Sequence, residues 1–139
     1  MKFSKGFKKI FKTFIRYSKA LNAWKRAAGQ NFAAARLKVG DYYWYGKGVD
    51  VDYIEAAEHY RRAADETDSR ASAQAYFNLG WMHHTGQGLP KDFHLSKRFY
   101  DMAAERSPEA NLPSTIALVG LYFGFVSDSV KSVSRKRLK

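Results

Sequence analysis

The 139-residue sequence contains no cysteine and only three prolines. Without cysteine the chain has neither a disulfide framework nor a thiolate metal site, although this absence leaves the cellular compartment open. The histidines also lack a metal-ligand spacing, because His83 and His84 are adjacent and no His-x3-His pair occurs. Adjacent positions point about 100° apart on a helix. We therefore expect no metal site.

Motifs for catalysis or phosphate binding are also missing. Five residues separate Gly40 from Gly46, and Gly48 follows Lys47, whereas a P-loop needs four residues between its glycines and Ser or Thr after the lysine. Neither Ser-x-x-Lys nor Gly-x-Ser-x-Gly occurs. We expect no catalytic residue, no cofactor and no small-molecule substrate, and so a protein that is not an enzyme.

Long uninterrupted apolar runs are rare. Lysines interrupt every apolar run in the first 20 residues, which therefore lack the roughly 7 to 15 apolar residues of a signal peptide. The run from Ile116 to Val126 has eleven residues, against about 20 for a membrane-spanning helix. We interpret residues 114–126 as an apolar helix that caps the fold or meets a partner.

Acidic residues are absent from the first 40 positions, which carry eleven Lys or Arg. Residues 41–127 hold eight basic and twelve acidic side chains, and a basic tail at 127–139 follows. A nucleic-acid binder spreads its cations over the face that follows the phosphates. Because the folded centre is mildly acidic, we do not expect nucleic acid as a partner.

An internal repeat is the strongest signal in the sequence. The segment from Ala33 matches the segment from Ala73 without a gap at an offset of 40 residues, with nine identities in 34 positions. A preceding half unit aligns Ala20, Trp24, Ala27 and Ala28 with Ala56, Tyr60, Ala63 and Ala64. The repeats thus divide into a half unit at 19–32 and units at 33–72 and 73–113.

Each unit is predicted to form two antiparallel helices joined by a glycine loop. Paired glycines favour positive φ in the loop, and an aspartate then caps the second helix. Small residues let the helices approach closely, and a tyrosine fills the groove beside them. The residues with these structural roles are Gly40, Gly46, Gly48, Asp52, Ala56, Tyr60, Ala63, Gly80, Gly86, Gly88, Asp92, Tyr100 and Ala103. Stacked hairpins of this kind form an all-α solenoid.

The pattern Ala-x4-Gly-x5-Gly-x-Gly-x3-Asp-x7-Tyr-x2-Ala-Ala, found from Ala35 to Ala64 and from Ala75 to Ala104, resembles the Sel-1-like repeat, a relative of the tetratricopeptide repeat. The second unit looks most like the last repeats of sel-1-type adaptors of the endoplasmic-reticulum-associated degradation ubiquitin ligase. The resemblance implies a non-catalytic adaptor that binds other proteins, either the ubiquitin-ligase complex or its clients. It also implies a membrane-associated location in the endoplasmic reticulum, with mitochondrion and cytoplasm as alternatives.

Aromatic residues at the end of each unit's first helix are the candidates for partner binding. Trp44, Tyr45, Trp81 and His84 follow the residues expected to form the core. Aromatic side chains dominate the energetically important contacts of protein interfaces. The alternative, that these rings only pack against the adjacent repeat, is equally compatible with the sequence.

The basic segment at 1–18 is predicted to form an amphipathic helix. Its apolar and cationic side chains recur at helical intervals, and the residues expected to contact an anionic membrane are Phe3, Phe7, Lys8, Lys9, Phe11, Lys12 and Phe14. Such a segment could instead be a mitochondrial presequence or a cap on the first repeat. The second functional hypothesis is therefore a membrane-surface or organelle-targeted repeat protein that acts through this segment.

Overall fold

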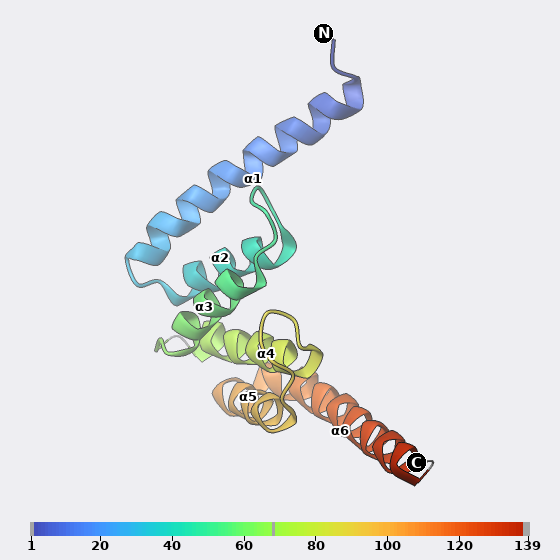
Figure 1. The fold of residues 1–139 in the computed structure, drawn as a ribbon. Helices are drawn as coiled ribbons and strands as arrows, with labels where there is room; N and C mark the ends of the chain where they lie inside the picture. Colours follow the sequence, from blue (N-terminus) through green and yellow to red (C-terminus); the bar gives the residue numbers. More distant parts are fainter. Residues whose placement is uncertain (1, 68, 138–139) are drawn as a thin grey trace.

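The computed structural model describes residues 2–67 and 69–137, and this part of the chain consists of six helices without a strand (Figure 1). The helices are α1 (Lys5–Gly29), α2 (Ala33–Tyr45), α3 (Tyr53–Ala64), α4 (Ser69–Thr85), α5 (Phe93–Arg106) and α6 (Pro108–Arg137). Helices α2 and α3 form one hairpin and α4 and α5 the next, with α1 and α6 at the two ends. The predicted all-α solenoid is confirmed.

The loops between paired helices turn on glycines. Gly46 and Gly48 both have φ of +66°, and Gly86 and Gly88 have φ of +76° and +72°. At Gly48 the backbone lies against Tyr17 and Ser18 of α1, so a β-carbon there would collide with main-chain atoms. Glycine thus meets two needs in the first loop, a left-handed turn and a close approach to the preceding helix.

The second helix of each hairpin begins at an aspartate cap. Asp52 Oδ1 accepts a hydrogen bond of 2.9 Å from the Glu55 amide, and Asp92 Oδ1 accepts one of 2.9 Å from the Leu95 amide. Both cap residues have extended backbone dihedrals, as an N-cap requires. The carboxylates satisfy amides that have no partner within the helix, and so they fix where α3 and α5 begin.

The core lies where a tyrosine of each second helix packs on a glycine of the first. A β-carbon on Gly40 would lie 2.6 Å from Tyr60 Cε1, and one on Gly80 would lie 2.7 Å from Tyr100 Cδ1. Both tyrosines are buried, among small side chains such as Ala56, Ala63 and Ala103. Small residues therefore set the spacing between the helices, and the tyrosines fill the remaining volume.

The terminal helices are longer than the sequence pattern suggested. Helix α1 is continuous across the boundary expected between residues 18 and 19, and only its second half packs on α2, through buried Leu21 and Ala28. Helix α6 extends over Pro108–Arg137, where a helix at 114–126 and a separate tail from 127 were expected. No glycine or proline follows Gly124, so nothing in the sequence ends the helix before the tail.

The length of α6 also changes how its apolar run is interpreted. Residues Pro113–Lys136 form a helical stretch of 24 residues that is long and apolar enough to cross a membrane, and little of it is buried in the fold. The apolar run from Ile116 to Val126 is shorter than this stretch, because the helix continues through the serines and the single aspartate that follow Val126. This finding rests on the length and composition of the helix.

Candidate protein-interaction surface

A groove of about 440 Å³ lies between α2 and α4, the first helices of the two successive units. Residues at helical spacings of three and four line it from each side, because such positions share one helix face. The third wall is a tyrosine from α3. The lining residues are Asp41, Trp44, Tyr45, Tyr60, Gln74, Phe77, Asn78 and Trp81.

The polar centre of the groove is a carboxylate paired with a phenol. Tyr60 Oη donates a hydrogen bond of 3.0 Å to Asp41 Oδ1, and Lys38 Nζ lies 3.7 Å from Asp41 Oδ2. Burial raises the pKa of Asp41 above its ordinary value, although the Tyr60 hydrogen bond and the Lys38 charge act against this. Burial and the Asp41 charge also raise the pKa of Tyr60, which therefore remains a hydrogen-bond donor.

The rim of the groove is aromatic and open to solvent. The side chain of Tyr45 is 64% exposed and that of Trp81 is 43% exposed. Trp44 is half-buried and packs on Tyr53, with ring centroids 4.7 Å apart. Lys47 Nζ lies 5.1 Å from the centroid of the Tyr45 ring, within the range of a cation–π contact.

The structure brings three of the four proposed partner-binding residues into this groove, namely Trp44, Tyr45 and Trp81. His84 lies outside it and lines a neighbouring cavity. The His84 ring contacts Trp81 edge-on at 5.6 Å, and its Nδ1 is 3.3 Å from Tyr100 Oη. Burial lowers the pKa of His84, so this ring is neutral near neutral pH.

Five lining residues were not expected from the sequence to contribute to a binding surface, namely Asp41, Tyr60, Gln74, Phe77 and Asn78. A signal for most of them was present, because Asp41 precedes Trp44 and Tyr45 by three and four positions, and Gln74, Phe77, Asn78 and Trp81 share one helical face. That the two faces meet across a groove depends on how the hairpins stack.

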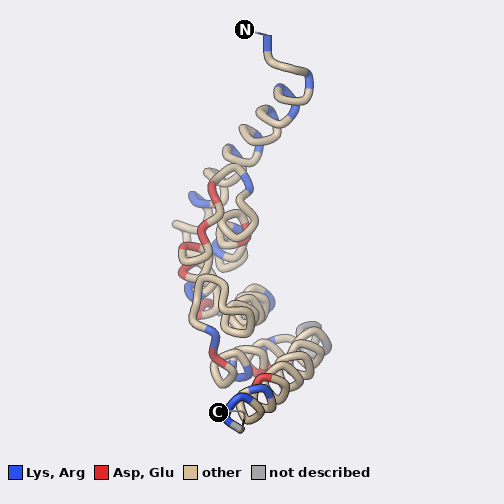
Figure 2. The backbone as a smooth tube through the Cα atoms, turned by 45° about the vertical axis from the view of Figure 1, so that its right-hand side comes forward, with Lys and Arg blue, Asp and Glu red and all other residues tan. Residues whose placement is uncertain are grey.

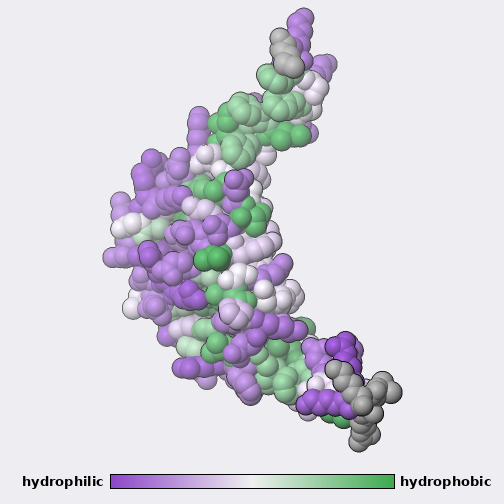
Figure 3. All heavy atoms as spheres, in the orientation of Figure 1, coloured by the Kyte–Doolittle hydropathy of each residue, from purple (hydrophilic) through white to green (hydrophobic). Residues whose placement is uncertain are grey.

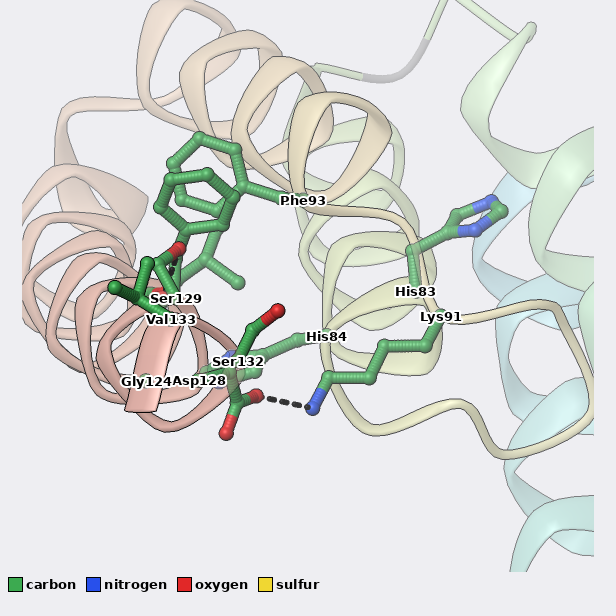
Figure 4. Close-up of a pocket in the computed structure, with 11 residues that line it drawn as sticks. His83, His84, Lys91, Phe93, Gly124, Asp128, Ser129, Ser132 and Val133 are labelled. Atoms are coloured by element: carbon green, nitrogen blue, oxygen red, sulfur yellow. Dashed lines mark hydrogen bonds and ion pairs between the residues drawn. The ribbon is translucent and has the colours of Figure 1, made fainter. Parts of the chain in front are cut away.

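The second cavity, of about 500 Å³, lies where α6 crosses the end of α4 and the loop before α5. In Figure 4, Lys91 reaches Asp128 across its mouth, with 3.6 Å between Nζ and Oδ2. Phe93 packs on Phe125 with ring centroids 4.3 Å apart. The His83 ring points away from the cavity, and its Nδ1 is 2.9 Å from the Pro90 carbonyl oxygen (Figure 4). The polar groups of this cavity are therefore largely paired within the chain.

The first half of α1 projects from the body of the protein as an amphipathic helix. Phe3 stacks on Phe7 at 4.5 Å, and Phe7 on Phe11 at 6.1 Å, while all three rings remain about half exposed. Figure 3 shows a band of apolar side chains along the projecting helix, and Figure 2 shows basic residues distributed along it. Phe14 and the lysines Lys8, Lys9 and Lys12 are also exposed.

Helix α6 projects at the opposite end, so that the molecule curves between its two terminal helices (Figures 1 and 3). Its outer face exposes apolar side chains along most of its length, among them Ile116, Tyr122, Phe123 and Val130. The basic residues Lys131, Arg135 and Lys136 follow at its carboxyl end. Both ends of the protein thus combine exposed apolar side chains with positive charge.

The family model described as Sel1 repeat matches residues 33–68 and 73–108. Protein sel-1 homolog 2 of Mus musculus is 51% identical over 105 residues, which are 76% of this chain and 15% of the mouse protein. The ERAD-associated E3 ubiquitin-protein ligase component HRD3A of Arabidopsis thaliana is 46% identical over 107 residues, or 77% of this chain and 15% of that protein. The chain therefore spans about one seventh of the length of these relatives.

A solved structure shares the fold. The protective antigen c5321 of uropathogenic Escherichia coli, described as displaying an SLR fold, superposes with a TM-score of 0.66 at 26% sequence identity. The superposition covers 77% of this chain and 22% of the antigen. The predicted resemblance to Sel-1-like repeats is confirmed by the family match and by this structural similarity.

Proposed function

Because this chain belongs to the Sel1 repeat family, we propose that it acts as a non-catalytic scaffold that holds other proteins against its repeats. The groove between α2 and α4 carries this proposal. It presents the exposed rings of Tyr45 and Trp81 beside a half-buried carboxylate, and exposed aromatic side chains around a concave site are typical of protein interfaces. Three of the residues expected to bind a partner, Trp44, Tyr45 and Trp81, line this one site.

The finer proposal is an adaptor role in a ubiquitin-ligase complex at the membrane of the endoplasmic reticulum. Support comes from the similarity to a ligase component of Arabidopsis thaliana and from the exposed apolar surface of α6. In this arrangement the residues Pro113–Lys136 contact the bilayer or a membrane-embedded partner, and the two hairpins remain available for protein binding. The basic side chains at the carboxyl end of α6 then lie near lipid headgroups.

Site-specific photo-crosslinking in microsomes tests this role. A photo-reactive phenylalanine analogue replaces Tyr45 or Trp81 in the groove, and a matched control carries it at Arg98, an exposed position on α5. We expect both groove positions to crosslink to a membrane-bound ubiquitin-ligase subunit, identified by mass spectrometry, and Arg98 to give little of this product. Equal yields from all three positions, or no ligase subunit among the products, would refute the adaptor role.

The amphipathic half of α1 supports a second candidate function, attachment to an anionic membrane surface. Its phenylalanines are exposed, and its lysines project from the same helix. Each lysine near such a surface contributes about 1 kcal/mol of binding free energy, so Lys8, Lys9 and Lys12 together correspond to roughly a hundredfold in affinity.

Liposome sedimentation tests this attachment and separates α1 from α6. The full chain is compared with a Phe7→Ser/Phe11→Ser variant and with a Lys8→Gln/Lys9→Gln/Lys12→Gln variant, on anionic and on neutral vesicles. We expect both variants to lose binding to anionic vesicles, while α6 remains intact in each. Unchanged binding by both variants would assign any membrane attachment to another part of the chain.

A further inference from the structure

We propose that the groove between α2 and α4 accepts a positively charged side chain, an arginine or lysine carried by an extended segment of a partner protein. The proposal rests on the scaffold function and names the chemistry of the partner. Two features of the lining point to a cation: it holds a single carboxylate and four aromatic rings besides Tyr60.

The carboxylate of Asp41 is the only acidic group among the residues that line the groove. It is half-buried, and its protein partners are the Tyr60 hydroxyl and the ammonium of Lys38, which lies 3.7 Å from Oδ2. A carboxylate at this depth loses water without gaining a close ion pair. A cation that entered the groove would provide that pair, and the charged hydrogen bond would form where solvent screening is weak.

The rings add a second attraction for positive charge. Trp44, Tyr45, Phe77 and Trp81 line the same groove as the carboxylate, and the face of an aromatic ring attracts a cation. The chain already shows this behaviour at the rim, where the Lys47 ammonium lies 5.1 Å from the centroid of the Tyr45 ring. The same environment disfavours other occupants: an acidic side chain would meet Asp41, and an apolar one would cover its carboxylate without pairing it.

Two lysines of the chain, Lys38 and Lys47, compete with an incoming cation. Lys38 lies 3.7 Å from Asp41, and its side chain is about half exposed. Because exposed ion pairs of this length are weak, a guanidinium that approaches more closely displaces it. Arginine suits the site better than lysine, since its planar group can stack on a ring while it donates to the carboxylate and to the amide oxygens of Gln74 or Asn78.

Titration of the ¹⁵N-labelled full chain with small probes tests the proposal. The chain has three tryptophans, and their indole N–H signals report on Trp44 and Trp81 in the groove and on Trp24, which lies on α1. The probes are N-acetyl-arginine methylamide, its neutral citrulline analogue and N-acetyl-glutamate methylamide. We expect the arginine probe to shift the Trp44 and Trp81 signals but not that of Trp24, and to bind about tenfold more tightly than the citrulline probe.

Three variants assign the effect to the groove. Asp41→Asn keeps an acceptor for the Tyr60 hydroxyl and should lower affinity for the arginine probe about tenfold. Asp101→Asn, which removes an equal charge from the exposed face of α5, should leave the affinity unchanged. Lys38→Gln should increase it, because it removes the competing ammonium. The dispersion of each spectrum shows whether the variant is folded.

Equal shifts with arginine and citrulline, or equal affinities for Asp41→Asn and Asp101→Asn, would overturn the cation proposal. Crosslinks from Tyr45 and Trp81 to a ligase subunit would then still support the scaffold function. Conversely, arginine binding that depends on Asp41, without any ligase crosslink, would support this groove chemistry and count against the adaptor role.

Discussion

The contact between Gly80 and Tyr100 provides the sharpest test of how the hairpins are packed. Gly80→Ala would place a β-carbon 2.7 Å from Tyr100 Cδ1, 2.8 Å from Cε1 and 3.3 Å from the Ser96 carbonyl oxygen. Carbon atoms in favourable contact are about 3.5 to 4.0 Å apart, so α4 and α5 would have to separate by nearly 1 Å. Tyr100 is fully buried, and close packing in protein interiors leaves little room for a ring to turn.

Two opposing terms set the size of the effect. Overpacking a buried contact costs about 1 to 3 kcal/mol, whereas alanine is favoured over glycine inside a helix by up to about 1 kcal/mol. We therefore expect Gly80→Ala to lower the free energy of unfolding by about 1 to 2 kcal/mol. For a chain of this size each kcal/mol corresponds to roughly 4 °C, so the melting temperature should fall by about 4 to 8 °C.

Circular dichroism at the helix minimum, followed during heating and during urea titration, measures the change. Gly120→Ala is the matched control, because a β-carbon at this position on α6 would meet nothing within 4 Å. It gains the helix propensity without a collision and should be neutral or slightly stabilising. The reasoning is refuted if Gly80→Ala is as stable as Gly120→Ala, since the helices would then have room that the structure does not show.

Three further predictions concern single positions. Gly88→Ala should destabilise by about 2 kcal/mol or more, because φ is +72° and the new β-carbon would lie 2.6 Å from Tyr53 Cβ; an unchanged urea midpoint would contradict this. Asp41→Asn should leave the free energy of unfolding near neutral pH unchanged or slightly higher. The pKa of Asp41 is raised in the folded protein, so the stability that its protonated form contributes is lost as pH rises through the folded pKa. Urea titrations near neutral pH and near pH 4 check this prediction. The hydrogen bond from the Leu95 amide holds the pKa of Asp92 below its ordinary value, so the stability contributed by the carboxylate is present above the unfolded pKa and lost as pH falls through the folded pKa. Asp92→Asn should therefore flatten the acid side of a melting-temperature profile, and an unaltered profile would argue against the cap.

The sequence by itself determined the repeat architecture, because its signals act over a few residues. Glycine is needed where φ is positive, as at Gly46 and Gly86, and an aspartate such as Asp52 caps the helix that follows it. These local requirements recur at an offset of 40 residues and so identify the repeating unit. The glycine that faces a tyrosine, as Gly40 faces Tyr60, repeats in the same way.

Only the tertiary structure decided which residues of neighbouring hairpins share a groove. Asp41 on α2 and Phe77 and Asn78 on α4 share a groove because successive units stack with a particular offset and rotation, which no local pattern specifies. The same stacking directs Trp81 into the groove and His84 into the neighbouring cavity, although both are on one helix. The fold also decides which part of α1 is buried, because only its second half meets α2, through Leu21 and Ala28.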